Sequence, residues 1–491
     1  MITKTDKELI ATYTIDSSNF QGNAEVVYIP ESIDELIAQI NECYGKNIPI
    51  TFSGAGTGLA GSRVAQGGAV ISSEKLNKII EFDEEKRTIT VQPAISNGEI
   101  SEFLEGKGYF LPPNPTERTA SIGGNVSTNA SGSRTYLYGP MRNYVQALQV
   151  ITPTGEILNL SREQGIPIID NHFEIIAESG TAIRLPILKY DIPNIKHSAG
   201  YYSKPDMHPI DYFIGAEGTL GFLSTITLNF IEKPENILGL IVFFDNVYKC
   251  INFVEELQSQ RVEKNAPNYE SNTNPNPRLI EFFDKYSLNM LRQKYTQLNT
   301  KCEAAIWIEQ EIYQNEDTII ENWYELIGKY TELIDETWAA QSQEEHLRFR
   351  DFRHTLPEKV YETIAQNKQY KVGVDGAVPN GNLRALYNHI SENADTFNLD
   401  RVIYGHIGNN HLHGNVFYKN DLEHSNAEEF YEKTISQILE MNGTVSAEHG
   451  IGKLKVKYLY QMFGEEIMLQ MRELKQAIDP KLLINQGNLF T

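Results

Sequence analysis

Short apolar runs alternate with segments of helical periodicity over the first half of the chain. Capping boxes formed by Ser32 with Glu35 and by Ser96 with Glu99 each mark the start of a predicted helix. Strand-length apolar runs precede, separate and follow these helices, with a loop extending to about residue 196 before the last of them. The predicted strands are 24–28, 48–52, 69–71, 87–91, 145–151 and 222–230.

The pattern changes near Lys233-Pro234, where we place a domain boundary. Beyond it, a strand at 239–244, a helix at 248–260 and further helix–strand alternation predict a second unit that mixes helices with strands. From Glu429 onward the chain is mostly helical. We therefore predict an α+β protein with three parts, at 1–233, 234–428 and 429–491.

Three segments of the first part are rich in glycine and small polar residues instead of apolar periodicity. They are 53–61, which directly follows a strand, the long irregular stretch 112–139, and the turn 215–221. A long irregular stretch inside a compact domain is usually functional. Three such segments in one domain favour a binding function over ordinary turns.

The first of these segments, 53–61, allows three interpretations. The first interpretation is a tight turn without a ligand, and the second is a dinucleotide-binding loop of the G-x-G-x-x-G type. The third is a different loop that holds a pyrophosphate through backbone N–H groups. A dinucleotide loop should open a full crossover helix. Gly61, Gly67 and Gly68 interrupt that helix, and the next strand begins at Ala69, so the third interpretation is favoured.

Two segments near the end of the chain carry five of its eleven histidines, together with a glutamate. Segment 405–415 contains His406, His411 and His413, and segment 446–450 contains Glu448 and His449. Imidazoles and a carboxylate are the ligands of a catalytic zinc-type site, which leaves one position open. A further histidine then remains for proton transfer.

The spacing of the histidines leaves the ligand set open. Residues seven apart on one strand point to opposite faces, so His406 and His413 can share a metal only if residues 408–410 form a turn. His411 and His413 share a face without any turn, as does Asn415. Unaided geometry therefore favours His411 with His413.

Composition and charge exclude several classes of function. Hydrophobic residues make up 41% of the 491 residues and no apolar run reaches 18, which predicts a soluble protein without a transmembrane helix. The N-terminus lacks the apolar core of a signal peptide, and three scattered cysteines form no disulfide framework, so we expect a cytoplasmic protein. The net charge, 43 − 65 = −22, argues against binding to nucleic acid or a broad hold on anionic lipid.

The order of these motifs resembles the vanillyl-alcohol-oxidase superfamily of FAD-linked oxidases, in particular the branch of D-lactate, glycolate and D-2-hydroxyglutarate dehydrogenases. The resemblance covers about residues 20–490. It implies a two-subdomain FAD-binding domain, then an α+β substrate (cap) domain and a helical C-terminal segment that returns to the FAD domain. Covalent members often use a histidine near the first loop, and none occurs between Thr51 and Ser62, so the resemblance implies non-covalent FAD.

By this resemblance the three polar segments and the C-terminus bind FAD. The implied residues are Ser53, Gly54, Ala55, Gly56, Thr57, Gly58, Leu59, Pro113, Thr116, Ser121, Gly123, Gly124, Asn125, Thr128, Asn129, Gly132, Glu217, Gly218, Leu220, Gly221 and Asn485.

The family's metal motif, His-x-Gly-Asp-Gly-Asn-x-His-x-Asn, maps onto 406–415 with its two histidines and final Asn kept. Its inner Asp, Gly and Asn are replaced by Asn409, Asn410 and His411. The resemblance thus favours His406, His413 and Glu448 as ligands of a divalent metal of the zinc type, over the pair His411 and His413.

The implied reaction is oxidation of a D-2-hydroxy acid, with hydride transfer to the flavin N5. His449 would be the base and Asn415 would contact substrate. Arg353 and Arg350 are the expected cations for the substrate carboxylate, since guanidinium binds carboxylate bidentately, and Lys371 is a further one. The alternatives are a flavin oxidase of another alcohol and an electron-carrying flavin subunit without its own substrate.

The expected partners are a small 2-hydroxy acid and an electron acceptor, either a quinone, a cytochrome or an electron-transfer flavoprotein. A homodimer is a further expectation. Peripheral attachment at the inner membrane face is the alternative to a purely cytoplasmic location.

Overall fold

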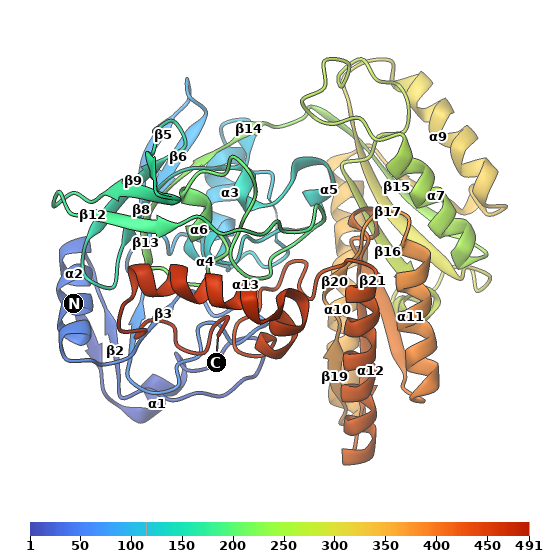
Figure 1. The fold of residues 1–491 in the computed structure, drawn as a ribbon. Helices are drawn as coiled ribbons and strands as arrows, with labels where there is room; N and C mark the ends of the chain where they lie inside the picture. The colour runs from blue at the N-terminus through green and yellow to red at the C-terminus, as the bar shows by residue number, and fades with distance from the viewer. Residues whose placement is uncertain (114, 491) are drawn as a thin grey trace.

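The computed structural model describes residues 1–113 and 115–490, which form two bodies joined after β14 (Ile231–Glu232). Figure 1 shows the N-terminal body in blue and green and the second body in yellow and orange. The chain then returns, and helix α13 (Val456–Ile478) lies across the first body. The predicted α+β class is confirmed.

The N-terminal body contains a small sheet and a larger antiparallel one. The small sheet has the order β1-β2-β4-β3, with β4 parallel to both of its neighbours. Its elements are β1 (Ile2–Lys4), α1 (Lys7–Ala11), β2 (Val26–Ile29), α2 (Ile33–Gly45), β3 (Ile50–Ser53) and β4 (Ala69–Ser72). The larger sheet, β5-β6-β13-β8-β9, consists of β5 (Ile79–Asp83), β6 (Thr88–Val91), β8 (Val145–Ile151), β9 (Ile157–Ser161) and β13 (Phe222–Asn229).

Smaller elements complete the N-terminal body, including strands inside the predicted loop before residue 196. They are α3 (Asn97–Glu105), β7 (Tyr109–Phe110), α4 (Ile122–Ser127), α5 (Thr135–Tyr138), η1 (Met141–Asn143), β10 (Ile168–Ile169), β11 (His172–Ile176), β12 (Ala182–Pro186) and α6 (Ile210–Phe213). The hairpin β10–β12 was missed because its strands are short and exposed, so they carry little apolar alternation.

The second body is built on one long antiparallel sheet. Its order is β18-β15-β17-β16-β21-β22-β19, and β20 also pairs with β22. The strands are β15 (Asn236–Phe244), β16 (Leu279–Asp284), β17 (Ala304–Ile312), β18 (Trp338–Ala340), β19 (Tyr370–Gly373), β20 (Gly376–Ala377), β21 (Arg401–Gly405) and β22 (His411–Tyr418). Its helices are α7 (Val247–Ser259), α8 (Lys285–Leu291), α9 (Glu316–Tyr330), η2 (Ile334–Glu336), α10 (Gln343–Asn367), α11 (Leu383–Thr396) and α12 (Asp421–Glu440).

The end of the chain completes the small sheet of the first body. Ile50 donates its N–H to Leu483 O at 2.9 Å, and Asn485 N donates to Ile50 O at 2.7 Å. Ile484 is fully buried in the same apolar cluster as Leu36 of α2. The C-terminal residues therefore pair with β3 as an extra strand. The segments that precede and follow the second body are thus both attached to the N-terminal body.

No helix among the described residues combines the length and the apolar character needed to cross a bilayer.

One buried carboxyl in the second body should limit stability at neutral pH. Asp284 caps α8 by accepting the Ser287 N–H at 2.7 Å, but its Oδ2 has no hydrogen-bond partner among the described residues. Burial, opposed by the bonds from Ser287, raises the pKa of Asp284 to about 6 from 3.8. The folded state therefore holds this proton more tightly than the unfolded state, and stability falls as the pH rises from about 4 through about 6.

We expect Asp284→Asn to stabilise the protein at pH 7.5 by up to about 3 kcal/mol, because Asn keeps the cap acceptor without the buried charge. The gain should nearly vanish at pH 4, where the wild-type carboxyl is protonated in the folded state. Urea unfolding at both pH values measures the gain, with Asp191→Asn, at an exposed site, as the control. An equal gain at both pH values would contradict the assignment.

Candidate active site

A tight turn between β21 and β22 brings three histidines together. His406 follows β21, the 3-10 turn η3 (Ile407–Asn409) comes next, and β22 begins at His411. Asn410 closes the turn with φ 50°, a left-handed conformation that Asn tolerates. The ring centroids lie 5.4 Å apart for His406 and His411, 5.5 Å for His406 and His413, and 4.5 Å for His411 and His413.

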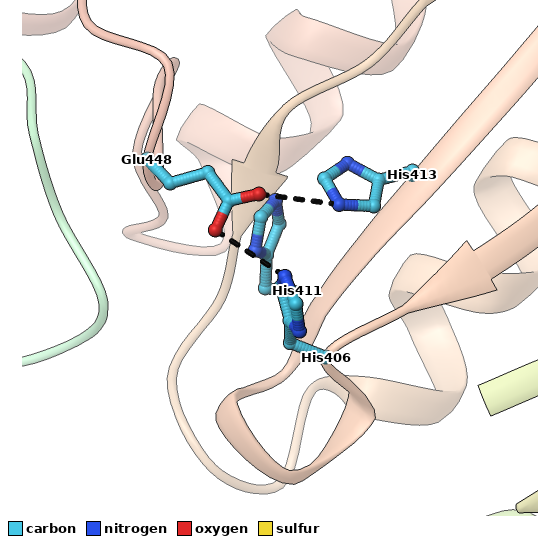
Figure 2. Close-up of side chains that lie close together, drawn as sticks. All are labelled: His406, His411, His413 and Glu448. Carbon is cyan, nitrogen blue, oxygen red and sulfur yellow. Dashed lines mark ion pairs between the residues drawn. The ribbon is translucent and has the colours of Figure 1, made fainter. Parts of the chain in front are cut away.

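The carboxylate of Glu448 faces these imidazoles, as Figure 2 shows. Its Oε2 lies 3.3 Å from His406 Nε2, and its Oε1 lies 3.4 Å from His413 Nε2. His411 lies beside them, and one ligand atom from each of the four residues lies within 4.8 Å of the others. Three nitrogens and a carboxylate that converge away from solvent fit a divalent transition metal.

A buried ion pair orients His406 from behind. Its Nδ1 donates to Glu281 Oε1, and Arg353 Nε donates to Glu281 Oε2 at 2.7 Å. Although burial opposes ionisation, the charges of His406 and Arg353 lower the pKa of Glu281 to about 2. A carboxylate on one ring nitrogen fixes the tautomer, so the other nitrogen, Nε2, is free to bind a metal.

Asp375 connects the histidine cluster to the second predicted segment. Its Oδ2 accepts from Ser446 Oγ and from Lys455 Nζ, both at 2.7 Å, and from the His449 N–H at 3.1 Å. Its Oδ1 lies 3.1 Å from His411 Nε2, but not in hydrogen-bonding geometry, and neither ring nitrogen of His411 has a partner among the described residues. His411 thus faces both Asp375 and the Glu448 cluster.

His449 lies at the border between the histidine cluster and the glycine loop. Its ring stacks on His413 with centroids 5.5 Å apart, and its Nδ1 lies 3.3 Å from Asp375 Oδ2. Burial lowers the pKa of His449 to about 4, against the opposing charges of Asp375 and Glu448. The imidazole is therefore neutral at pH 7 and can accept a proton. Asp375 favours a proton on Nδ1, which leaves Nε2 as the accepting atom.

The N-terminal body contributes two side chains to the same cluster. Lys196 Nζ donates to Glu448 Oε2 at 2.6 Å, and Ser131 Oγ donates to the same oxygen at 3.3 Å. The side chain of Lys196 is 2% exposed. The cluster is therefore assembled from both bodies of the chain and closed off from bulk water on this side.

A cavity beside His449 collects the three glycine-rich segments of the N-terminal body; we call it the glycine-loop cavity. The residues implied by the resemblance that line it are Ser53, Gly54, Ala55, Gly56, Thr57, Gly58, Ser121, Gly123, Gly124, Asn125, Thr128, Glu217, Gly218, Gly221 and Asn485. Leu59, Pro113, Asn129, Gly132 and Leu220 do not line it, and Thr116 lines a different cavity.

Close packing of main chain in this cavity explains several glycines. A Cβ on Gly123 would lie 2.6 Å from Pro93 Cβ, and one on Gly218, which has φ +74°, would lie 2.5 Å from Asn485 Nδ2. Only glycine lets the loops approach each other and a ligand this closely. The bare backbone of these loops suits close contact with a phosphate-bearing group that carries a flat ring.

The remaining predicted residues are placed on the second body. Arg353 is buried on α10, with Nη1 unpartnered among the described residues, whereas Arg350 is exposed on the same helix. Asn415 is buried on β22 opposite Gly373 of β19. Lys371 lies two pairs further along these strands, and its Nζ is 4.8 Å from the centre of the Tyr361 ring.

Sequence reasoning missed Lys196, Glu281 and Asp375. Glu281 carries a usable signal, because it is an ionisable residue inside an apolar strand, Leu279–Asp284. Lys196 lies in an irregular loop without periodicity, and its contact with Glu448 spans 252 residues. Such a pairing leaves no trace in local sequence.

Two protein-family models match the chain. Residues 24–161 match the FAD binding domain, and residues 233–489 match the C-terminal domain of the FAD linked oxidases. The solved structure of an alkyldihydroxyacetonephosphate synthase superposes with a TM-score of 0.68 at 15% identity, over 98% of this chain and 81% of that chain. That likeness concerns the fold alone.

Curated relatives align over nearly the full length. The chain is 25% identical to the glycolate oxidase subunit GlcD of Bacillus subtilis, over 97% of this chain and 92% of that protein. It is 27% identical to a D-lactate dehydrogenase of Anaerostipes hadrus, over 98% and 93%. It is 26% identical to a D-2-hydroxyglutarate dehydrogenase of Stutzerimonas stutzeri, over 99% and 95%.

Proposed function

The chain belongs to the FAD-linked oxidases, and we propose that it uses non-covalent FAD and a divalent metal, zinc in our proposal, to oxidise a D-2-hydroxy acid to the 2-oxo acid. One observation carries the proposal. His406, His413 and Glu448 converge on a common point beside His449, and His449 lines the glycine-loop cavity. The candidate metal ligands and the candidate proton acceptor therefore lie next to the cavity that is expected to hold FAD.

The bound groups divide the chemistry between them: FAD supplies at N5 the acceptor for the hydride that leaves C2, and the metal supplies a Lewis acid that lowers the pKa of the substrate hydroxyl. The lining residues of the glycine-loop cavity would hold FAD. His406, His413 and Glu448 would hold the metal, with His411 in reach as a fourth donor.

The chain's own residues then have three tasks. His449 accepts the hydroxyl proton at Nε2, while Asp375 holds its Nδ1 side. Arg353, whose Nη1 is free, binds the substrate carboxylate, and Asn415 contacts the substrate from β22. Arg350, exposed on α10, supplies positive charge to a cavity that Arg353 also lines, and Lys371 of β19 is a further cation in this proposal.

The altered inner metal motif is compatible with this proposal. Asn410 replaces a glycine where the chain is left-handed, and Asn is the non-glycine residue best suited to that conformation. Its amide is held on both sides: Oδ1 accepts from Gln258 Nε2, and Nδ2 donates to Asn380 Oδ1, both at 2.7 Å. The turn that brings His406 to His413 is thus preserved despite the substitution.

Anaerobic titration of the purified holoprotein tests the proposed reaction. We expect at least one acid among D-lactate, glycolate, D-malate and D-2-hydroxyglutarate to bleach the flavin absorbance, because hydride transfer reduces the ring. The L-enantiomers are the control and should leave it oxidised. A flavin that none of these acids reduces would favour a flavin subunit without its own substrate, and protein without flavin absorbance would sink the proposal.

Metal analysis of histidine variants tests the ligand set. We expect His406→Ala and His413→Ala to lose bound metal, with affinity falling at least about 100-fold, because each removes a direct ligand. His411→Ala should retain most of its metal, since Asp375 also faces that ring. His424→Ala, at an exposed site on α12, is the control. Loss of metal from His411→Ala and His413→Ala, but not from His406→Ala, would instead select the pair His411 and His413.

Two alanine substitutions in the same loop test the FAD-binding assignment. Gly56 has φ +83°, and a Cβ there would lie 2.5 Å from Arg63 Cζ. Arg63 cannot easily move, because its guanidinium donates to Gly54 O at 2.8 Å and to Thr12 O at 2.7 Å. A Cβ on Gly58 would meet only Asp16 Oδ2 at 3.7 Å.

We therefore expect Gly56→Ala to raise the Kd for FAD about tenfold or more, and Gly58→Ala to change it little. Flavin fluorescence during reconstitution of the apoprotein measures both constants. Equal affinities of Gly56→Ala and wild type would show that this loop does not need its left-handed turn to hold FAD.

A further inference from the structure

A cavity of about 420 Å³ between the two bodies contains an unusual concentration of arginine; we call it the arginine cavity. It is bounded by the segment after α3, by β16 and β17, and by α10. His406 and Arg353 lie at one end of its lining, so it adjoins the proposed metal site. Its cationic side chains are Arg118, Arg134, Lys233, Arg278, Arg350 and Arg353.

The cations that line this cavity outnumber its carboxylates. The carboxylates are Glu105, Glu235, Glu281 and Glu309, against six cations, of which Arg118 pairs with Glu102 outside the lining at 3.0 Å. Arg278 Nε donates to Glu309 at 2.7 Å, and Glu281 is occupied by Arg353 and His406. Among the described residues no carboxylate lies in ion-pairing distance of Arg134 or Arg350. In a chain of net charge −22, such a cationic surplus requires an explanation.

Two arginines of this cavity have guanidinium nitrogens without partners among the described residues; Arg353 is buried and Arg134 is half-buried. Arg353 is buried, and its Nη1 has no hydrogen-bond partner among the described residues. The guanidinium of Arg134 lies over the Phe110 ring at 5.8 Å and donates to no acceptor among those residues. Burying a charged donor without an acceptor is costly, so natural proteins seldom leave one unless a ligand satisfies it.

Arg134 also lies within the electrostatic reach of two further arginines. Burial and the charges of Arg278 and Arg350 lower the pKa of Arg134 to about 10, against the opposing charges of Glu309 and Glu105. Like charges that face one another destabilise the protein. An anion between Arg134, Arg278 and Arg350 would replace this repulsion with attraction. It would also accept bidentate hydrogen bonds from the guanidinium groups.

We propose that the arginine cavity binds a second anionic group at the far end of the substrate. The substrate is then a D-2-hydroxy acid with a terminal carboxylate, phosphate or sulfonate. Its C2 end lies at His406 and Arg353, and its tail lies between Arg134 and Arg350. The proposal rests on the proposed oxidation of a 2-hydroxy acid, and it narrows the substrate to doubly anionic acids.

Matched substrate pairs test the proposal on the holoenzyme. D-2-hydroxyglutarate and D-2-hydroxyvalerate share five carbons and differ only in the terminal group. D-3-phosphoglycerate with D-glycerate, and (S)-3-sulfolactate, which has the D configuration, with D-lactate, form the corresponding phosphate and sulfonate pairs. In at least one pair we expect the anionic member to have a kcat/KM about 100-fold higher, from one or two charge-assisted hydrogen bonds. The pair with the largest ratio identifies the tail.

Variants then assign the preference to the cavity. Arg350→Met and Arg134→Met should each reduce the ratio within that pair about tenfold, mainly through KM of the anionic member. Arg348→Met, on the same helix but 71% exposed and paired with Glu344, should leave the ratio unchanged. If Arg134→Met fails to fold, the exposed Arg350 still provides the test.

Binding without turnover separates failure of this proposal from failure of the oxidation. Glutarate should perturb the flavin spectrum of the wild-type holoenzyme with a Kd about tenfold lower than valerate, and Arg350→Met should abolish the difference. Uncharged-tail acids oxidised as well as anionic ones would overturn the second anionic site and leave the oxidation standing. If no acid reduced the flavin but glutarate still bound more tightly than valerate, the oxidation would be overturned and the second anionic site would stand.

Discussion

The carboxylate of Glu217 is the contact on which the geometry of the site depends. It accepts the backbone N–H groups of Ile451 and Gly452, each at 2.7 Å, and is fully buried between the two ends of the chain. Glu217 itself is left-handed, with φ 51°. This clamp fixes the segment that carries Glu448 and His449 against the glycine-loop cavity. Burial raises the pKa of Glu217, and the hydrogen bonds from Ser62 and the backbone, together with the charge of Lys455, oppose that rise.

Close backbone contacts and hydrogen bonds also restrain the chain around this clamp. Gly452 has φ +51°, and a Cβ there would lie 1.9 Å from Ala60 O. Asn485 donates to Glu217 O at 3.0 Å and accepts from the Phe52 N–H at 2.8 Å, so the C-terminal strand is held to β3 and to the clamp at once. Each histidine of the cluster comes from the second body, yet the clamp that positions Glu448 belongs to the first. Neither body therefore contains the site by itself.

Local features of the fold could be predicted, whereas the composition of the site could be predicted only in part. The predicted helix starts at Ser32 and Ser96 are those of α2 and α3, because a cap is a local interaction. Of the two predicted capping boxes only that at Ser96 is complete, since Glu35 accepts the Glu31 N–H instead of the Ser32 N–H. The turn at residues 408–410 was required for His406 to meet His413, and it forms, but it brings His411 into the cluster as well. Spacing alone could not decide this, since the turn geometry depends on Asn410 and its long-range partners. Lys196 reaches Glu448 across 252 residues, beyond the range of any periodicity.

A strongly acidic protein can bind a doubly anionic substrate only if the positive charges near the substrate outweigh the effect of the protein's negative net charge. At physiological ionic strength, surface charges are screened beyond about 8 Å, so most of the −22 charge acts weakly on a ligand inside the protein. On a ligand within the arginine cavity, the nearest charges act most strongly. Glu281 binds Arg353 and His406, and Glu309 binds Arg278, so both carboxylates are engaged with side chains that they position. The carboxylates thus fix the orientation of two guanidinium groups, and Arg134 and Arg350 are left to attract an anion.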